Sequence, residues 1–342
     1  MRLLCTGAAG FISSNVIDAL VGQGHIVTGV DMLDEKIHPT IPNYLNPKVE
    51  YIYTPLHIWN PPTLDFEAVI HFAALGGVSR AAREPKAILV ANCLGTERLC
   101  QIIKDRCPKL KQAILASSFS IYGNNYKYFC TLCPTIPDHS SSGTRTEEDL
   151  TLGNYEVLCP QCNGPMVLEP ITEKTLPSPL ELYAVSKYTQ ELLWNTLFCK
   201  KTTLRFSSVY GPRLRLHDGE ATIIAKLAGW IKDGIPPTLF EDGKQLRDWI
   251  YVGDVIHAIN ALLEGREAAP IINVCSGAGT TLLDACNILA ETFHTTCYPK
   301  IVGGYRSGDI RHCIGDYSNF KKLTGKIPIP FSIESALASF IK

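Results

Sequence analysis

Short apolar runs alternate with segments of helical spacing along much of the chain. The run from Arg2 to Cys5 is largely apolar, a glycine turn follows, and Ile12, Val16 and Leu20 then recur every four residues, which is typical of a helix. Further strands are predicted at 25–30, 49–53, 68–72 and 112–116, with helices near 85–105 and 181–198. This alternation predicts an α/β fold with a doubly wound, Rossmann-type parallel sheet that carries helices on both faces.

The alternation is interrupted once and later changes character. Residues 126–172 break it, and from about residue 215 helices, Gly/Pro turns and short strands are mixed, as in a smaller second domain. The length of 342 residues agrees with two domains, because a domain usually has roughly 150 residues. We therefore expect a Rossmann domain and a smaller C-terminal α/β domain, the first at 1–125, 173–215 and 250–275 and the second at 216–249 and 276–342.

Net charge and cysteine content narrow the class of protein. Lys and Arg number 32 and Asp and Glu 33, a net charge of −1, whereas a nucleic-acid-binding protein usually has a basic excess. The 13 cysteines are an odd number, and most stand singly in apolar segments, where reduced thiols act as small hydrophobic groups. A reducing cytoplasm is therefore expected rather than a secreted disulfide framework. We predict no cleaved signal peptide and no membrane span, because no apolar run is long enough.

A glycine-rich turn lies between the first strand and the first helix. Gly7-Ala8-Ala9-Gly10-Phe11-Ile12 would let a pyrophosphate approach the backbone N–H groups at a helix N-terminus. Asp31 ends the next strand, where a carboxylate can accept hydrogen bonds from both ribose hydroxyls and would repel a 2′-phosphate. The turn therefore favours NAD over NADP, and an ordinary glycine turn is the alternative.

A Tyr-x-x-x-Lys pair opens the predicted helix at 181–198. Tyr183 and Lys187 share one helix face, so the ammonium could lower the pKa of the phenol and make it a general base. The serine run at 117–120 follows a predicted strand, which places hydroxyls at the carboxyl end of the sheet, where ligands bind. The pair alone is a common chance pattern; its combination with the glycine turn and Asp31 is not.

In these motifs the chain resembles an extended short-chain dehydrogenase/reductase of the nucleotide-sugar epimerase/dehydratase group. The resemblance runs nearly end to end, in family order, through TGAAGFI (6–12), HFAAL (71–75), NCLGT (92–96), SSFSIYG (117–123), YAVSK (183–187), LRFSSVYGPR (204–213), RDWIYVGDV (247–255) and YRSGDIRH (305–312). It implies NAD as cofactor, a nucleotide-diphosphate sugar (UDP-, dTDP-, GDP- or CDP-linked) as substrate, and a homodimer formed through the helices near 92–105 and 183–198.

The resemblance also implies roles for single residues. The catalytic group would be Tyr183 as base, Lys187 as its partner and Ser118 as the hydroxyl that binds the reacting sugar oxygen. The cofactor would lie against Gly7, Gly10, Phe11, Ile12, Asp31, Ala73, Ala74, Asn92, Tyr183 and Lys187. The second domain would hold the sugar nucleotide, with substrate contacts from Ser118, Ser120, Ser208, Arg247, Arg306 and Asp309; the two arginines suit a diphosphate.

Departures from the family pattern bear on the reaction. Dehydratases of this group carry Asp-Glu directly after the catalytic hydroxyl residue, whereas this chain has Phe119 and Ser120. Epimerisation through a transient 4-keto sugar is therefore favoured, with Tyr183 taking the C4 hydroxyl proton. Alternatives are a nucleotide-sugar dehydrogenase, reductase or dehydratase of the same fold, and a non-catalytic NAD-binding regulator. The family's adenine-contacting Asp is Pro55 here, and a frequent substrate-side serine is Ala81.

The interrupting segment 126–172 carries two cysteine pairs. Cys130 and Cys133 are followed, 25 residues later, by Cys159 and Cys162, and two CxxC pairs can complete a tetrahedral four-thiolate zinc site. We predict a zinc-ribbon-like insert with a structural zinc; an unmetallated loop and a redox pair are the alternatives. Its two basic and six acidic residues, a net charge of −4, oppose binding of nucleic acid. Similar inserts are a feature of a subgroup that includes dTDP-rhamnose 4-epimerase-like proteins.

Overall fold

A parallel sheet forms the centre of the computed structural model, which describes residues 1–133, 141–142, 145–217, 222–306 and 309–340. The sheet has seven strands in the order β13-β9-β5-β4-β1-β2-β3, and every neighbouring pair is parallel. Its strands are β1 (Arg2–Thr6), β2 (Ile26–Asp31), β3 (Glu50–Tyr53), β4 (Ala68–His71), β5 (Gln112–Ser118), β9 (Lys200–Phe206) and β13 (Ile271–Val274). The predicted doubly wound sheet is confirmed.

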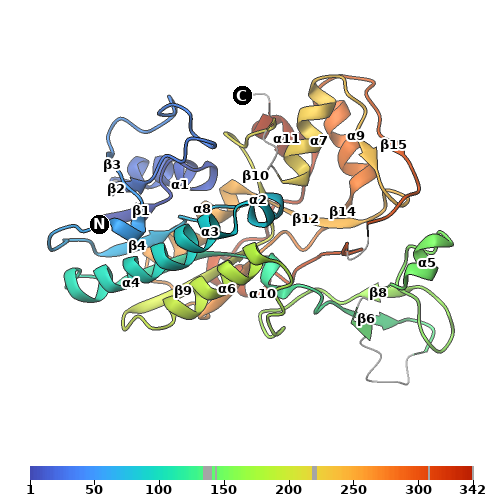
Figure 1. Ribbon diagram of the computed structural model, residues 1–342, viewed down its shortest axis with the longest axis horizontal. Helices are drawn as coiled ribbons and strands as arrows, with labels where there is room; N and C mark the ends of the chain where they lie inside the picture. Colours follow the sequence, from blue (N-terminus) through green and yellow to red (C-terminus); the bar gives the residue numbers. More distant parts are fainter. Residues whose placement is uncertain (134–140, 143–144, 218–221, 307–308, 341–342) are drawn as a thin grey trace.

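Helices cover both faces of this sheet (Figure 1). Side chains alternate along β1, so that Leu3 and Cys5 join the apolar cluster under one set of helices and Leu4 joins the cluster under the other. The first face carries α1 (Phe11–Gly22), α8 (Val252–Leu263) and α10 (Ser318–Thr324); the second carries α4 (Gly95–Arg106) and α6 (Leu182–Trp194). Shorter turns precede α4 or follow strands: η1 (Leu56–Ile58), α2 (Val78–Arg83), α3 (Pro85–Ile88), η2 (Leu89–Leu94) and η3 (Phe119–Tyr122).

A smaller unit lies above the carboxyl end of the sheet and has its own apolar core. It contains the sheet β10-β12-β14 and the pair β11-β15. The elements are β10 (Ser208–Tyr210), β11 (Thr238–Leu239), β12 (Leu246–Tyr251), β14 (Gly279–Thr281), β15 (Lys300–Ile301), α7 (Ile223–Lys232), α9 (Leu282–Thr292) and α11 (Ile333–Phe340).

The elements divide differently from the predicted ranges at two places. β10 was expected in the Rossmann domain, but it pairs with β12 in the smaller sheet. Helix α10 was expected in the second domain, but Phe320 and Leu323 are buried in the core of the large sheet. For α10 the apolar face of the helix explains the packing, which a boundary drawn from the alternation of strands and helices does not capture.

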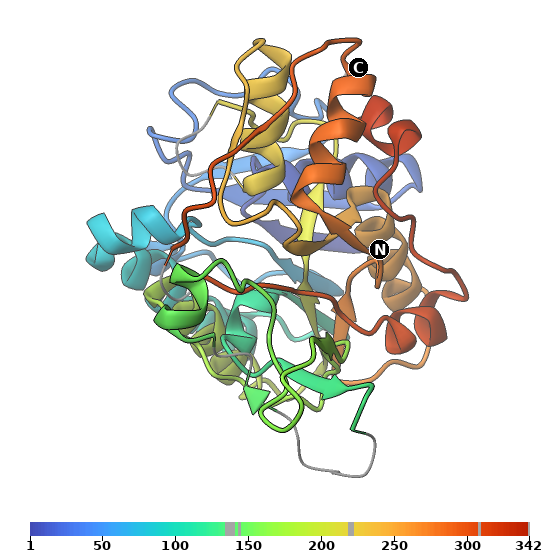
Figure 2. The same cartoon turned by 90° about the vertical axis from the view of Figure 1, so that its right-hand side faces the viewer.

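The predicted insert forms a small antiparallel sheet at one end of the molecule (Figure 2). It comprises β6 (Lys127–Cys130), β7 (Ser141–Ser142), β8 (Met166–Leu168) and α5 (Glu147–Thr151), with sheet order β7-β6-β8. Tyr128 and Cys130 alternate inward along β6 and pack with Met166 and Leu168.

Of the described helices, none is long and apolar enough to cross a membrane.

The strand order fixes where a ligand can bind. The chain runs outward from β1 through β2 to β3 and then returns to the other side of β1 as β4 and β5. The loops that follow β1 and β4 therefore diverge at the carboxyl edge of the sheet, and a crevice opens at such a reversal.

Candidate active site

A cleft opens at this reversal point and is lined by nine of the ten residues that sequence comparison with the family placed at the cofactor. These are Gly7, Gly10, Phe11, Ile12, Asp31, Ala73, Ala74, Tyr183 and Lys187. They come from the ends of β1, β2 and β4 and from α6, elements that are distant in sequence and adjacent in the sheet. The tenth, Asn92, is buried beneath the cleft wall and is not among its lining residues.

The glycine turn after β1 is shaped for a close backbone approach. Gly7 has φ +66°, and a Cβ on it would lie 2.7 Å from the backbone nitrogen of Ala73. Gly10 precedes α1, and within the described chain no side chain caps that helix terminus. Free N–H groups and the helix dipole at such a terminus suit a pyrophosphate. The residues present therefore fit a dinucleotide.

The far end of the cleft carries the Asp31 carboxylate. Its oxygens accept hydrogen bonds from the backbone N–H groups of Ala9 (2.9 Å) and Leu33 (2.8 Å), which fix its orientation. Sequence reasoning missed two neighbours in the cleft wall: Tyr44, whose hydroxyl donates to Ala9 O (2.8 Å), and Arg213, whose guanidinium lies 5.0 Å from the Tyr44 ring centre. Of these two residues, only Arg213 could have been found from the sequence, since it is the last residue of the motif at 204–213.

Tyr183 and Lys187 lie on one face of α6, as their spacing predicted. The helix begins with Glu181, whose carboxylate accepts hydrogen bonds from Tyr183 N (2.7 Å) and Ala184 N (2.8 Å). The Lys187 ammonium donates to Ala116 O (2.6 Å) and to Gln190 Oε1 (2.5 Å). Gln190, one turn after the lysine, is a third residue that sequence reasoning missed.

The pKa prediction for this pair was wrong for the protein as it stands. We expected Lys187 to lower the pKa of the phenol; instead burial raises the pKa of Tyr183 to about 12, the Glu181 carboxylate adds to the rise, and a hydrogen bond with Ser118 opposes it. Burial also lowers the pKa of Lys187 to about 8. Desolvation disfavours the charged form of both groups, and spacing along a helix does not reveal it.

Of the two serines at the end of β5, Ser118 is the one that contacts Tyr183. Ser117 points elsewhere, and its hydroxyl donates to Glu191 Oε1 at 2.5 Å. Glu191 in turn pairs with Arg205 (2.8 Å), and both side chains are buried. Glu191 therefore holds α6 to β5 through the Ser117 hydrogen bond and to β9 through the Arg205 ion pair.

Asn92 is buried behind the wall of the cleft and holds two of its elements together. Its side-chain oxygen accepts from Leu75 N (2.7 Å), and its amide nitrogen donates to Ser186 Oγ (2.9 Å). Asn92 therefore fixes the loop after β4 against α6 and does not itself line the cleft.

Comparison with known proteins agrees with this geometry. The family model described as "NAD dependent epimerase/dehydratase family" matches residues 3–144 and 161–275. The chain belongs to this family. It is 28% identical to a dTDP-L-rhamnose 4-epimerase from Burkholderia thailandensis, over 93% of this chain and 88% of the relative. A UDP-glucuronate 4-epimerase from Thermodesulfobacterium geofontis is 27% identical, over 98% of this chain and 93% of the relative. The structure of a UDP-glucose 4-epimerase from Thermotoga maritima, with UDP-glucose, superposes with a TM-score of 0.75 at 25% identity, covering 99% of this chain and 97% of the other.

Three residues that the sequence predicted to contact substrate, Arg247, Arg306 and Asp309, are not among the residues that line the cofactor cleft. Arg247 donates to the carbonyl oxygens of Leu246 (2.9 Å), Arg311 (3.0 Å) and Ile310 (3.0 Å). The exposed Arg306 lies over the Phe240 ring, 4.5 Å from its centre. Asp309 is exposed, and Ser307 and Gly308 of the same motif lie outside the described residues.

The serines and the family departures occupy distinct environments. Ser208 is half-buried at the start of β10, and the buried Ser120 hydroxyl has no hydrogen-bond partner among the described residues. Pro55 lines the cofactor cleft. Ala81 is buried in a small apolar cluster that packs against Tyr183, so a serine hydroxyl is absent from that wall.

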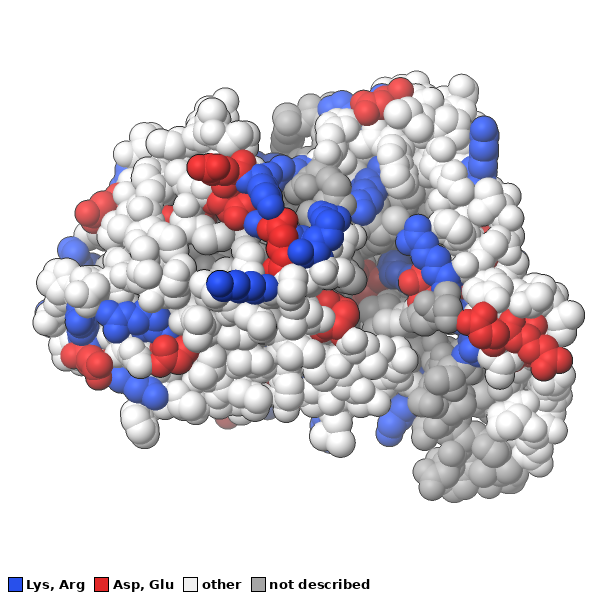
Figure 3. All heavy atoms as spheres, in the orientation of Figure 1, with Lys and Arg blue, Asp and Glu red and all other residues white. Residues whose placement is uncertain are grey.

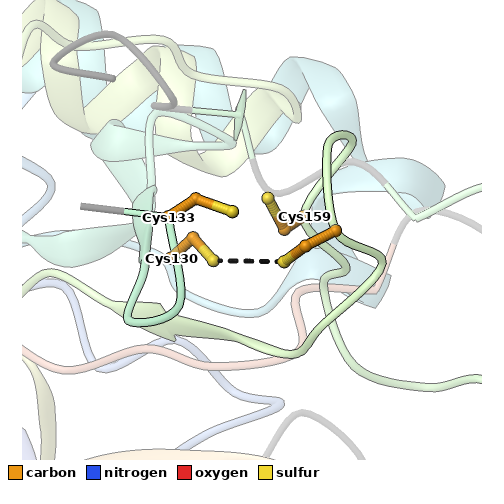
Figure 4. Close-up of side chains that lie close together, drawn as sticks. Cys130, Cys133 and Cys159 are labelled. Atoms are coloured by element: carbon orange, nitrogen blue, oxygen red, sulfur yellow. Dashed lines mark hydrogen bonds between the residues drawn. The ribbon is translucent and has the colours of Figure 1, made fainter. Parts of the chain in front are cut away.

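The four cysteines of the insert converge on one point (Figure 4). Cys130 and Cys133 come from the end of β6 and the turn after it, Cys159 and Cys162 from the turn before β8, and all four sulfur atoms lie within 4.8 Å of one another. The Cys130 and Cys162 sulfurs are 3.5 Å apart. A tetrahedral zinc with Zn–S bonds of about 2.3 Å needs sulfurs about 3.8 Å apart, so this arrangement fits a four-thiolate metal.

The outer surface of the insert is acidic. Figure 3 shows acidic side chains gathered at this end of the molecule, where α5 carries Glu147, Glu148 and Asp149. Asp138, which also counts toward the negative charge of the segment, lies outside the described residues. A surface of this sign repels phosphate groups.

Proposed function

We propose that this protein is an NAD-dependent epimerase that inverts C4 of a nucleotide-diphosphate sugar. The observation that carries the proposal is the composition of the proposed catalytic group: Tyr183 and Lys187 line the cofactor cleft, Ser118 contacts Tyr183, and no carboxylate follows the serine. Phe119, at the position where dehydratases have Asp, is buried in an apolar cluster and packs edge-on against Tyr122. Elimination of water lacks its acid and base there, whereas oxidation and re-reduction at one carbon need only the Tyr183 proton relay.

The chain's own groups then have defined tasks. The Gly7–Gly10 turn and Asp31 would hold NAD. When bound, this cofactor would accept a hydride from the sugar and return it. In its deprotonated form, which a neighbouring Lys187 ammonium would favour, Tyr183 would take the C4 hydroxyl proton, and it would give that proton back after the sugar has presented its other face. Ser118 holds the reacting oxygen through its hydroxyl, and Lys187, anchored on Ala116 O and Gln190, places a positive charge beside the phenol.

Uracil and thymine nucleotides are the favoured carriers of the sugar. The relatives reported above are named as 4-epimerases of dTDP-rhamnose, UDP-glucuronate and UDP-glucose. We therefore expect UDP- or dTDP-sugars to turn over before GDP- or CDP-sugars.

We propose further that the four cysteines bind one structural zinc. All four positions of the metal would be taken by the protein, which leaves none open for catalysis. The other nine cysteines are free thiols, and most of them are buried. Because free thiols suit a reducing compartment, we keep the cytoplasmic location as part of the proposal.

A homodimer is also part of the proposal. The outer surfaces of η2 and α6 expose large apolar side chains, among them Leu94 (53% exposed) and Leu192 (52% exposed), within or beside the helices expected to pair. Apolar side chains that recur on one exposed helical face are typical of an interface.

The test begins with mass spectrometry of the denatured, purified protein, which should release NAD. Incubation with UDP-, dTDP-, GDP- and CDP-sugars should then give a C4 epimer without added NADH and without net cofactor reduction. Tyr183→Phe should retain NAD and lose turnover by at least about a hundredfold, the usual contribution of a general base. Full turnover by this variant would remove Tyr183 from the mechanism, and stoichiometric consumption of NADH would favour the reductase alternative.

A further inference from the structure

The insert contacts one segment of the second domain at successive points. The described residues of this segment, which is called segment 303–312, are 303–306 and 309–312; they run beside the insert (Figure 2) and include Arg306 and Asp309. Its contacts with the insert, in chain order, are Gly303 O with the Tyr155 hydroxyl (2.5 Å), the Tyr305 hydroxyl with Glu147 (2.6 Å) and Thr151 (3.2 Å), and Asp309 O with Arg145 (2.7 Å). Arg311 and His312 follow, both on Glu156.

Glu156 is the centre of these contacts. One carboxylate oxygen accepts from Arg311 Nε at 3.1 Å, and the other lies 2.8 Å from His312 Nε2. Because Leu246 N–H donates to His312 Nδ1 (3.1 Å), the ring proton belongs on Nε2 and points to Glu156. Burial alone would raise the pKa of Glu156, but the hydrogen bonds from His312 and Arg311 lower it to about 2, so the carboxylate is ionised at neutral pH.

Arg311 is fully buried and joins the insert to a tight turn of the second domain. Besides Glu156, its guanidinium donates to Glu241 (2.8 Å) and Asp242 (2.7 Å). Arg145 of the insert reaches the same Glu241 at 2.6 Å, and both of those side chains are buried. A set of alternating charges that is partly buried and has fixed hydrogen bonds orders the elements that supply it.

The backbone held in this way is the backbone that positions Arg247. The carbonyl oxygens of Ile310 and Arg311 accept both ends of the Arg247 guanidinium, at 3.0 Å each. Glu156 therefore reaches Arg247 through one residue, Arg311. None of the residues in this chain of contacts is among the described residues that line the cofactor cleft.

We propose that the four-cysteine insert positions the nucleotide-sugar site, with Glu156 and Arg145 as positioning residues that hold segment 303–312 and, through it, Arg247. The four cysteines would fix, with a bound metal, the turn that begins three residues after Glu156. The inference rests on the proposed function, because it takes Arg247, Arg306 and Asp309 as the groups that bind the nucleotide sugar.

The test is Glu156→Gln, compared with Glu148→Gln in the same insert. Glu148 is exposed on α5, so its variant makes the same chemical change without touching segment 303–312. Glu156→Gln should fold, because Arg311 keeps Glu241 and Asp242 as partners. Calorimetry with UDP and with dTDP should show a dissociation constant about tenfold higher for Glu156→Gln, within the range seen for coupling residues. NAD and zinc content should match the parent protein, and Glu148→Gln should bind both nucleotides normally.

Tyr155→Phe serves as a second variant with little risk to folding, since it removes one hydroxyl that reaches Gly303 O. It should weaken UDP and dTDP binding in the same direction by a smaller factor. With an active sugar substrate, both variants should raise KM while kcat stays within about twofold, which a merely destabilising substitution would not do.

The outcomes separate the two proposals. A parent protein that binds none of UDP, dTDP, GDP or CDP refutes the proposed function, and the positioning role with it. A parent protein that binds UDP or dTDP, together with a Glu156→Gln variant of equal affinity, refutes the positioning role alone. If Glu156→Gln lost NAD to the same extent as it lost affinity for UDP or dTDP, the residue would have a general structural role, and this result would also overturn the inference.

Discussion

Gly7→Ala is the sharpest test of the cofactor cradle because two separate penalties meet at this position. The backbone at Gly7 has φ +66°, a left-handed conformation that costs an L-alanine about 1 kcal/mol. The added Cβ would also lie 2.7 Å from Ala73 N and 2.8 Å from Ala73 Cα. Both are backbone atoms, so the contact is relieved only by moving the loop after β4, at about 1–3 kcal/mol by analogy with overpacked cores.

Gly24→Ala is the matched control. Gly24 has φ +83°, and a Cβ there would meet nothing within 4 Å, so this variant carries the conformational penalty alone. In urea unfolding we expect the free energy of unfolding to fall by about 1 kcal/mol for Gly24→Ala and by about 2–4 kcal/mol for Gly7→Ala.

NAD content gives a second reading of the same pair of variants. Ala73 lines the cleft, so a displaced Ala73 narrows it, and Gly7→Ala should be purified with much less NAD than Gly24→Ala. Equal unfolding free energies and equal NAD content in the two variants would refute the close approach of β1 and β4 as the basis of the cradle.

Two further predictions concern the lysine and the metal. The pKa of Lys187 is lowered to about 8 in the folded protein from its ordinary value of 10.5. The unfolded chain therefore binds more protons between these two pH values, and the free energy of unfolding should rise with pH from about 8 to 10. Urea unfolding of Lys187→Met at several pH values should show a flatter rise, and an unchanged slope would contradict the burial of the charge. Plasma emission should find one zinc per chain in the parent protein, and Cys159→Ser should lose this zinc and keep its NAD. Cys93→Ser changes a thiol outside the cluster and should keep both zinc and NAD. Zinc retained by Cys159→Ser, or absent from the reduced parent protein, would overturn the four-thiolate site.

The cofactor half of the site was predictable because its signals are local. Gly7 and Gly10 lie three residues apart, Tyr183 and Lys187 four apart, and Asp31 ends the strand beside β1. Alternating strands and helices then place the ends of these elements at one edge of a parallel sheet. Short spacings and a regular topology are enough to bring such residues together.

Burial and long-range pairing were beyond the reach of the sequence. Lys187 reads as a charged partner of Tyr183, yet its desolvation and its bonds to Ala116 O and Gln190 depend on how α6 packs against β5. Asn92 reads as a cofactor residue, and only the fold shows that its amide is consumed by Leu75 and Ser186. The pKa direction for Tyr183 failed for the same reason, since spacing carries no information on solvent access.

In the insert, too, the sequence predicts contacts between close motifs but not pairing between distant residues. Its cysteine spacing predicts the thiol cluster, because two CxxC turns need only meet once. Its glutamates look alike in sequence, yet Glu148 faces solvent on α5 while Glu156 meets Arg311, a residue 155 positions away in the chain. The net charge of −4 argues only against binding of nucleic acid, and it does not reveal that Glu156 and Arg145 pair with residues of the second domain. Buried charges that face one another across two domains cost desolvation energy unless both partners are in place. That cost is the physical reason to expect the insert and segment 303–312 to order together, and with them Arg247, which we propose binds the diphosphate.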